Sequence, residues 1–169
     1  HGTLSELRIG SVPSISQVMV PRAIEQVRRR YPGLRIDINI LKLEEAIDYL
    51  LLGRGDCVAM SYRLEHPGLD FMPLASGELF CIVPEGHELA GRKQVSAKEI
   101  IRYPLIGIDP NDPYGRIMAG IFASRKLAYD ITIRARFGTT VCALVKAGLG
   151  IAVIDQFTVA HGGYPGVEL

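Results

Sequence analysis

The chain has 169 residues, of which 48% are hydrophobic, enough for one medium domain or two small lobes with a packed core. Its 19 Lys and Arg residues against 18 Asp and Glu residues leave a formal net charge of only +1, so no global field favours nucleic acid, an anionic membrane or an acidic substrate. No apolar run approaches the ~20 residues that a membrane span needs, and the N-terminus lacks the three regions of a signal peptide. We therefore expect a globular protein without a membrane partner.

The three cysteines, Cys57, Cys81 and Cys142, lie inside apolar runs. Their separations match neither a Cys-x-x-Cys metal or redox pair nor a secreted disulfide framework, so we expect reduced, buried thiols in a cytoplasmic protein. The opening His-Gly pair is typical of an expression-tag remnant. We therefore expect the chain to be a segment cut from a longer protein.

The first half of the chain alternates strand and helix patterns. Apolar alternation over 7–11 predicts a strand, and apolar residues at helical spacing from Ile15 to Tyr31 predict a helix that Pro32 and Gly33 stop. A strand, a short helix and another strand are predicted next, at 34–41, 44–53 and 56–62. This β-α-β-α-β order, with nearly continuous apolar strands, predicts a parallel sheet buried on both faces.

In the second half of the chain the order of predicted strands and helices changes. Two strand-like runs, 69–76 and 78–84, are separated by a short gap and fit an extended crossing between lobes. The segment 96–99, "SAKE", matches a Ser-x-x-Glu capping box, and "DP" at the start of 112–126 predicts a helix with Asp as its cap and Pro at its first position. The remaining predicted elements repeat the β-α-β order, with strands at 103–109, 130–137 and 149–155 and a helix at 139–148.

These patterns predict two α/β lobes of similar build that join near residues 74–78, without a Pro/Gly-rich linker. The first lobe is predicted to cover residues 1–75 and the second residues 76–164. Residues 165–169 look like the start of another strand rather than a finished terminus. We therefore expect the chain to lack elements that would complete the fold.

The serines, glycines and histidines form no recognisable catalytic, cofactor or metal motif. No serine has the Gly-x-Ser-x-Gly frame of a hydrolase, and the histidines lie in tag-like or Gly/Pro-rich contexts. Gly148 and Gly150 precede a predicted strand instead of following one, so we interpret them as a helix end and a tight turn, not a nucleotide loop. His87 and Glu88 have no second histidine at helical spacing. We expect no enzymatic activity, no cofactor and no metal.

The start of the first predicted helix leaves two interpretations open. Ser14 and Gln17 fit a Ser-x-x-Gln capping box, so Ser14 can simply cap the helix. Its loop also follows a parallel strand, where the free N–H groups and the dipole of a helix start favour an anion. Thr139 and Thr140 hold the same place in the second lobe. Two hydroxyl-bearing helix starts suggest a cleft with donors on both walls, suited to a small carboxylate.

Several segments resemble, in order and spacing, the effector-binding domain of LysR-type transcriptional regulators. Residues 7–38 are similar to the family's strand, helix ending in Arg-x-x-Tyr-Pro, and second strand. "LLLGRGDCVAM" is similar to its Gly-x-x-Asp segment, "LDFMPLASGELFCIVPEGHELAG" to its crossover into the second lobe, and "LVKAGLGIAVI" to its helix-Gly-x-Gly-strand signature. The resemblance covers the chain from about Leu7 to Leu169.

The resemblance implies two Rossmann-like lobes, as in type 2 periplasmic binding proteins, with a small-molecule effector bound in the cleft between them. It also implies that a strand and helix after the second lobe complete the first lobe, so residues 165–169 would start this return strand and the C-terminal completion would be missing. DNA would be read only by an N-terminal helix-turn-helix that this chain lacks. The full-length protein is expected to be a homodimer or homotetramer.

By the same resemblance, ligand contacts fall on both lobes. They are Ser14, Lys42, Leu43, Ser61, Phe137, Gly138, Thr139 and Thr140. Leu43 departs from the family, where a small hydroxyl residue is frequent. "VIDQFT" stands in place of the usual Leu-Pro and resembles the regulators of opine, lysine and arginine metabolism, which implies an amino-acid-like ligand. Asp109 or Asp155 would then contact its amine, or both would only cap helices or turns.

Three functions are compatible with two α/β lobes of this kind. A ligand-sensing module would act by population shift, because the metabolite binds the closed cleft better and so controls DNA binding and transcription by the full-length protein. A solute-binding protein of a transport system would share the lobes, but the missing signal peptide and reduced-type cysteines argue against it. A small α/β enzyme would need a nucleophile–base or cofactor frame that the sequence lacks.

Overall fold

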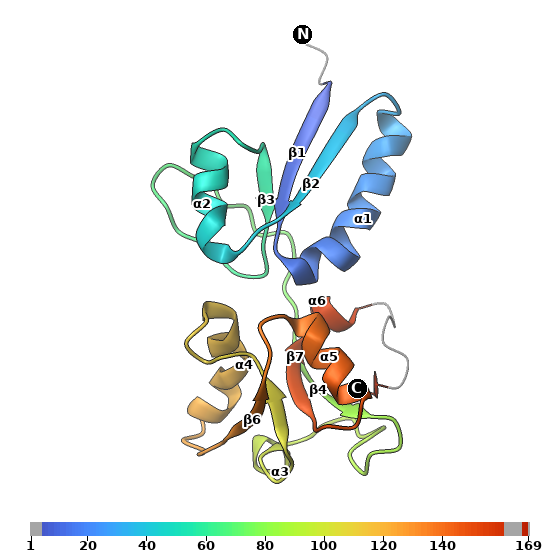
Figure 1. The fold of residues 1–169 in the computed structure, drawn as a ribbon, viewed down its shortest axis with the longest axis vertical. Helices are drawn as coiled ribbons and strands as arrows, with labels where there is room; N and C mark the ends of the chain where they lie inside the picture. The colour runs from blue at the N-terminus through green and yellow to red at the C-terminus, as the bar shows by residue number, and fades with distance from the viewer. Residues whose placement is uncertain (1–4, 161–166, 169) are drawn as a thin grey trace. The chain divides into compact units, whose positions relative to one another are not determined.

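The chain divides into two units, His1–Ser76 and Gly77–Leu169, in a computed structural model (Figure 1). The structure describes residues 5–160 and 167–168. None of the helices in these described ranges combines the length and apolar character that a membrane crossing requires.

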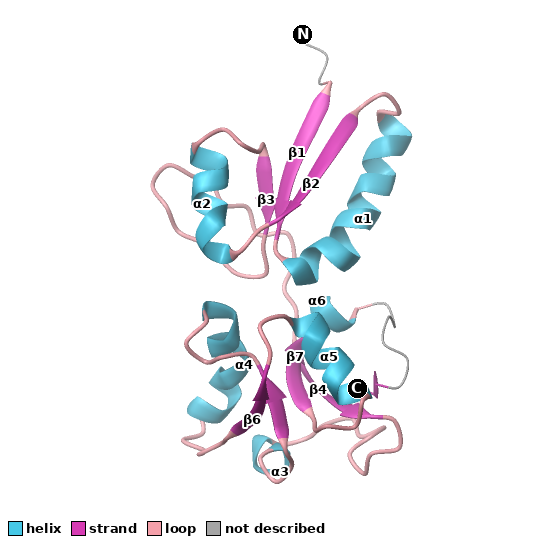
Figure 2. Ribbon diagram, in the orientation of Figure 1, coloured by secondary structure: helices cyan, strands magenta, loops and turns pink. Residues whose placement is uncertain are grey.

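The first unit contains a parallel sheet in the order β2-β1-β3 (Figure 2). In chain order its elements are β1 (Glu6–Ser11), α1 (Pro13–Arg30), β2 (Arg35–Ile40), α2 (Leu43–Leu51) and β3 (Cys57–Ala59). β1 is the central strand, because Ile9 pairs with both Ile38 of β2 and Cys57 of β3. The predicted β-α-β-α-β order and its parallel sheet are confirmed.

The prediction that this sheet is buried on both faces is wrong for β2. Of its six residues only Ile36 is even half-buried, and Ile38 and Ile40 are 45% and 56% exposed. β2 is an edge strand, and its sequence "RIDINI" alternates polar and apolar residues instead of running continuously apolar. β3 is also shorter than predicted, since only three of its residues pair with β1.

The second unit repeats the alternation of strands and helices and adds antiparallel pairing. Its elements are β4 (Leu79–Pro84), α3 (Ala97–Ile100), β5 (Leu105–Gly107), α4 (Pro113–Ala123), β6 (Ile131–Arg134), α5 (Gly138–Lys146), β7 (Ala152–Asp155), α6 (Gln156–Val159) and β8 (Val167–Glu168). β5 and β6 are parallel, and Leu105 of β5 forms a further parallel bridge with Ile151, just before β7. β4 runs antiparallel to β7 and β8.

Two helix starts that the local sequence predicts are confirmed. Ser96 caps α3 by accepting the Glu99 N–H, and the Glu99 carboxylate accepts the Ser96 N–H at 2.9 Å. Asp112 caps α4 by accepting the Tyr114 N–H at 2.8 Å, and proline occupies the first helical position. Helix α4 ends at Ala123 rather than at the predicted residue 126.

The strand-like run at 69–76, which also fits an extended crossing between lobes, lies just before the division between the two units at Ser76. These residues form no strand, and Met72 and Leu74 are 75% and 79% exposed. Pro73 between them has no N–H to donate to a partner strand, which explains why an apolar run stays outside the sheets.

The expectation that residues 165–169 return to the first lobe is also wrong, as far as they are described. Val167 and Glu168 form β8, which pairs with Pro84 and Val83 of β4 in the second unit. β4 lies between β7 and β8, so its second edge is open to this strand. Residues 165, 166 and 169 lie outside the described part of the chain.

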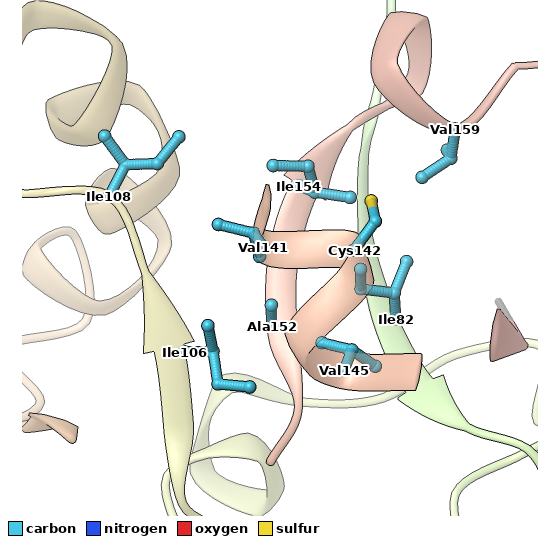
Figure 3. Close-up of a cluster of buried hydrophobic side chains, with 9 residues drawn as sticks. All are labelled: Ile82, Ile106, Ile108, Val141, Cys142, Val145, Ala152, Ile154 and Val159. Carbon is cyan, nitrogen blue, oxygen red and sulfur yellow. The ribbon is translucent and has the colours of Figure 1, made fainter. Parts of the chain in front are cut away.

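A cluster of buried side chains packs α5 against the strands of the second unit (Figure 3). Its members are Ile82, Ile106, Ile108, Val141, Cys142, Val145, Ala152, Ile154 and Val159. All three cysteines are free thiols, as predicted. Cys142 is buried and Cys81 is partly buried, but Cys57 is exposed, so the expectation of three buried thiols is wrong. Cys57 is the first residue of the three-residue β3, where little covers it.

Candidate functional site

The carboxyl ends of the three strands of the first unit meet at one edge of the sheet. Ser11, the last residue of β1, lies opposite Ile40 of β2 and Ala59 of β3. Leu41 N–H then donates to Ser11 O at 2.9 Å, so the pairing continues past the strands. Loops after parallel strands gather at such an edge, where ligands bind in open α/β sheets. The predicted ligand residues on these loops and helix starts are Ser14, Lys42, Leu43 and Ser61.

Ser14 does not cap α1, so this interpretation of the helix start is wrong. The N-cap is Val12, with an extended backbone, and Pro13 is the first helical residue. Proline is favoured there because its fixed φ suits the first turn and it has no N–H to leave unpaired. No side chain caps α1, and Ser14 lies inside its first turn.

Ser14 nevertheless has a different environment from its neighbouring serines. The Ser11 hydroxyl donates to the carbonyl of the next residue at 3.0 Å, and the Ser16 hydroxyl donates to Pro13 O at 2.8 Å. Ser14 is only 9% exposed, and its hydroxyl has no hydrogen-bond partner among the described residues. The N–H groups of Ser14 and Ile15 likewise have no partner there, as expected for a first turn. The start of α1 therefore offers a hydroxyl and two backbone donors.

Lys42 and Ser61 lie on the other two loops of this edge. Lys42 is the N-cap of α2, and its N–H donates to Glu45 Oε2 at 2.8 Å. Its side chain is exposed and forms no ion pair with a described residue. Ser61 is half-buried, two residues after the end of β3. Leu43 is the first residue of α2, and its side chain lies outside the described part.

The second unit has a comparable edge, formed by the carboxyl ends of the parallel strands β5, β6 and β7. Ala135 N–H, just after β6, donates to Gly107 O at the end of β5 at 2.9 Å. Predicted ligand residues follow β5 and β6 and end β7. They are Asp109, Phe137, Gly138, Thr139, Thr140 and Asp155.

Helix α5 starts without a side-chain cap. Its N-cap, Phe137, is 39% exposed, and the Cζ of Arg136 lies 5.9 Å from the centroid of its ring. The N–H groups of Gly138, Thr139 and Thr140 have no hydrogen-bond partner among the described residues, and neither do the two threonine hydroxyls. The helix dipole adds partial positive charge at this end.

The helices fall into two groups, those that begin with a side-chain cap and those that begin without one. Side-chain oxygens of Ser96, Asp112 and Asp155 cap α3, α4 and α6. No side chain caps α1 or α5, and at the start of α2 the Glu45 carboxylate accepts the Lys42 N–H. Uncapped N–H groups at a helix start suit an anion, because they point at it and the dipole favours its charge. The described residues include no group of three or more His, Cys, Asp or Glu placed to hold a metal ion.

Asp109 is engaged in its own loop. Its Oδ1 accepts hydrogen bonds from the N–H and the side-chain amide of Asn111, at 2.9 and 3.0 Å. Its Oδ2 lies 4.0 Å from Nη1 of Arg134, a residue that the sequence analysis did not connect with it. The turn-forming role is therefore confirmed. Because the side chain is 47% exposed, Oδ2 also remains open to solvent.

Asp155 is buried and its carboxylate is used inside the second unit. It is the N-cap of α6 and is 7% exposed. Its Oδ1 accepts the Thr158 N–H at 2.9 Å, and its Oδ2 accepts the Thr158 hydroxyl at 2.7 Å and the hydroxyl of Tyr114. Burial, followed by the Asp155 charge, raises the pKa of Tyr114, so its phenol stays protonated and donates. The helix-cap alternative for Asp155 is confirmed.

Sequence reasoning missed Tyr114 as the partner of Asp155. The two residues are 41 positions apart, and no local pattern links them. The one available signal was Asp155 itself, an acidic residue at the end of an otherwise apolar strand, since such a residue needs several donors to be buried.

Known proteins are similar to this chain in sequence and in fold. The family described as "LysR substrate binding domain" matches residues 1–166. The chain is 27% identical over 156 residues to the transcriptional activator protein LysR of Escherichia coli K12, a match that covers 90% of this chain and 49% of that protein. The chain thus spans about half the length of the curated relatives it matches.

Two solved structures show the fold. HinK, a LysR family transcriptional regulator from Pseudomonas aeruginosa, has a TM-score of 0.81 at 26% identity, over 99% of this chain and 58% of that chain. The regulatory domain of CcmR from Synechocystis PCC6803, in complex with 2-PG, has a TM-score of 0.81 at 17% identity, over 96% of this chain and 78% of that chain. These likenesses confirm the predicted two-lobe α/β fold of the periplasmic-binding-protein kind.

Proposed function

Because this chain belongs to the LysR substrate-binding domain family and is an effector-binding domain, we propose that it senses a small metabolite for a LysR-type regulator. The metabolite would bind one conformation of the domain better than the others and so change their proportions. In the full-length protein this shift would control DNA binding and transcription. DNA contacts would come from an N-terminal helix-turn-helix outside this chain, in a cytoplasmic homodimer or homotetramer.

We infer the chemical class of the effector from the helix starts. The observation that carries this inference is that α1 and α5 begin without side-chain caps, whereas α3, α4 and α6 are capped. N–H and hydroxyl donors with a favourable dipole select a small carboxylate. The proposed effector contacts are Ser14, Lys42, Leu43, Ser61, Phe137, Gly138, Thr139 and Thr140.

A second feature of the sequence supports an amino-acid-like effector. The segment "VIDQFT" resembles the regulators of opine, lysine and arginine metabolism, whose ligands carry an amine as well as a carboxylate. Asp155 is not free to contact this amine, because its oxygens accept three internal donors. Asp109 is the better candidate, since its Oδ2 has only the distant Arg134 as a partner. We propose that Asp109 contacts the amine.

A thermal-shift screen of amino acids, opines and aromatic acids tests the effector class. A ligand at 100 times its Kd stabilises the folded domain by ~2.7 kcal/mol, which is large enough to identify a hit. We expect hits among compounds with a carboxylate, and the strongest among those that also carry an amine. A strong hit that has no carboxylate would contradict the anion argument.

Paired variants test the proposed contacts. We expect Ser14→Ala and Thr139→Val each to weaken binding of the hit by about 0.5–1.5 kcal/mol, the usual value of one hydrogen bond. Ser16→Ala and Thr132→Val are the matched controls, because their hydroxyls donate to Pro13 O and Leu105 O within the protein. Titration calorimetry measures the affinities. Equal binding by all four variants would rule out these helix starts as the site.

The two alternatives, a transport protein and an enzyme, predict different observations. A transport role is not favoured, because the matched relatives are transcriptional regulators. A full-length gene that starts with a helix-turn-helix would exclude it. Turnover of a hit by the purified chain would instead revive the enzyme alternative, for which the relatives give no support.

A further inference from the structure

Asp155 is a buried carboxylate in the second unit. None of the ion pairs in the described part of the chain includes it. Instead it accepts the N–H and hydroxyl of Thr158 and the hydroxyl of Tyr114. A buried charge is tolerated only when several donors surround it, so each of these bonds matters. We call these three residues the Tyr114–Asp155–Thr158 network.

Tyr114 links the network to the end of β5. It lies in the first turn of α4, directly before Gly115. A Cβ added at Gly115 would lie 2.0 Å from the backbone oxygen of Asp109, so the start of α4 is in direct contact with the loop after β5. Tyr114 therefore connects this contact with the loop after β5 to Asp155 at the end of β7.

Thr158 links the network to the start of α5. Thr158 is 1% exposed, and a Cβ added at Gly138 would lie 3.0 Å from its Cγ2 and 3.1 Å from its Oγ1. The same added atom would lie 3.2 Å from Cδ1 of Ile154, which packs beside Val141 of α5 (Figure 3). The first residue of α5 therefore rests directly on the network.

We propose that the Tyr114–Asp155–Thr158 network is a positioning device for effector binding. It holds the start of α5 so that the free N–H groups of Gly138, Thr139 and Thr140 keep one orientation, and it does so without contacting the effector. This inference rests on the proposed function, which assigns those N–H groups to the effector. Removing one bond of the network lowers the affinity for an anion at α5, while the buried cluster still holds the helix on the sheet.

The Tyr114→Phe variant of the 169-residue chain tests the proposal, because it removes only the hydroxyl. Tyr103→Phe is the matched control, since the Tyr103 hydroxyl donates to Glu88 Oε1 at 2.5 Å in the same unit but outside the network. Sulfate is the probe anion, and NMR follows the amide signals of Gly138–Thr140 during its titration. We expect about fivefold weaker sulfate binding in Tyr114→Phe and wild-type affinity in Tyr103→Phe.

Amide hydrogen exchange tests the network without any ligand. Val141 N–H donates to Phe137 O at 3.1 Å and closes the first turn of α5, whereas Ile106 N–H donates to Ile151 O at 2.9 Å in the sheet. We expect Tyr114→Phe to speed exchange at Val141 by about fivefold relative to Ile106. If both amides speed up equally, or neither does, the network has no special role at α5 and the proposal is overturned.

The sulfate titration tests the proposed anion site at α5, and the amide exchange tests the positioning network. If sulfate does not shift the wild-type signals, the anion site at α5 is refuted, and the exchange result alone decides whether the network orders this helix start.

Thr158→Val and Thr158→Ser provide a second test that does not depend on Tyr114. Thr158→Val loses the hydroxyl and should reproduce the local exchange effect, whereas Thr158→Ser keeps the bond to Asp155 and should give a smaller effect. The reverse order would overturn the proposal.

Discussion

Arg8 and Asp56 are joined by three hydrogen bonds in the first unit. Arg8 N–H donates to Asp56 Oδ2 at 2.7 Å and its guanidinium donates to Oδ1 at 3.3 Å, while Asp56 N–H donates to Arg8 O at 2.9 Å. The pair connects the middle of β1 to the residue before β3. The bonds from Arg8, first that of its backbone, hold the pKa of Asp56 below its ordinary value of 3.8.

We expect Asp56→Asn to lower the thermal unfolding midpoint at neutral pH. Because folding lowers the pKa of Asp56, its carboxylate contributes stability above pH 3.8, and this contribution is lost as the pH falls through the folded pKa. The difference in unfolding midpoint between Asp56→Asn and the wild type should therefore become smaller below about pH 3.8 in circular dichroism melts.

Glu65→Gln is the control for this experiment. Its partner Arg63 lies at 3.1 Å, but both side chains are largely exposed, and such pairs contribute little. We expect no change in the midpoint. A deficit of Asp56→Asn that stays the same at every pH would show that the charge of Asp56 is not what stabilises the pair.

The three thiols should react in the order of their exposure. Partial burial and the neighbouring Asp56 charge raise the pKa of Cys57, but its side chain is exposed, whereas burial raises the pKa of Cys81 to about 11, and burial together with the Asp155 charge raises the pKa of Cys142 to about 11. At neutral pH we expect a maleimide to modify Cys57 at least about tenfold faster than the other two, since the thiolate reacts and needs access. Mass spectrometry after timed quenching measures the rates. Cys57→Ser should abolish the fast phase, and a fast phase that persists would contradict the described burial.

Ile154 lies at the centre of the buried cluster that holds α5. It is fully buried, so Ile154→Ala should lower the free energy of unfolding by about 2–5 kcal/mol, and Ile154→Val by about 0.5–1.5 kcal/mol. Ile117→Ala on α4 is the control, because Ile117 is 42% exposed and surface changes usually stay within about 0.5 kcal/mol. Urea unfolding followed by circular dichroism gives the values. An Ile154→Ala variant as stable as the control would contradict the packing of α5.

Elements with a local signal could be predicted from the sequence. The cap of α3 follows from the four residues "SAKE" and the cap of α4 from the pair "DP", and the parallel order of the first sheet follows from alternating strands and helices. The error at Ser14 was also local. The proline rule that placed the start of α4 at Pro113 applies equally at Pro13, where it makes Val12 the N-cap and leaves Ser14 inside the first turn.

Contacts between residues far apart in the chain could not be predicted from the sequence patterns. An apolar run at 69–76 looks like a strand until the pairing partner is known, and only pairing distinguishes it from the strand that follows. β8 has only two residues and its place depends on the free edge of β4. The role of Asp155 depends on Tyr114, which topology and not sequence spacing brings to it.

Two glycines of α4 should respond in opposite ways to the same change. A Cβ at Gly115 would lie 2.0 Å from the backbone oxygen of Asp109 and 3.0 Å from that of Ile108, whereas a Cβ at Gly120 would meet nothing within 4 Å. Gly115→Ala must push the start of α4 away from the loop after β5, and overpacking of this kind costs about 1–3 kcal/mol. Gly120→Ala should instead stabilise the protein by up to about 1 kcal/mol, because alanine is the better helix former.

Thermal and urea unfolding of the two variants check this pair of predictions. They share a helix and a chemical change, so any difference between them reports the contact of Gly115 with Asp109 rather than helix propensity. Since Tyr114 lies next to Gly115, displacement of the start of α4 should also weaken the bond to Asp155. Gly115→Ala should therefore speed exchange at Val141, as Tyr114→Phe does, and Gly120→Ala should leave it unchanged. If both variants stabilise the protein equally, the close approach of α4 to the loop after β5 is contradicted.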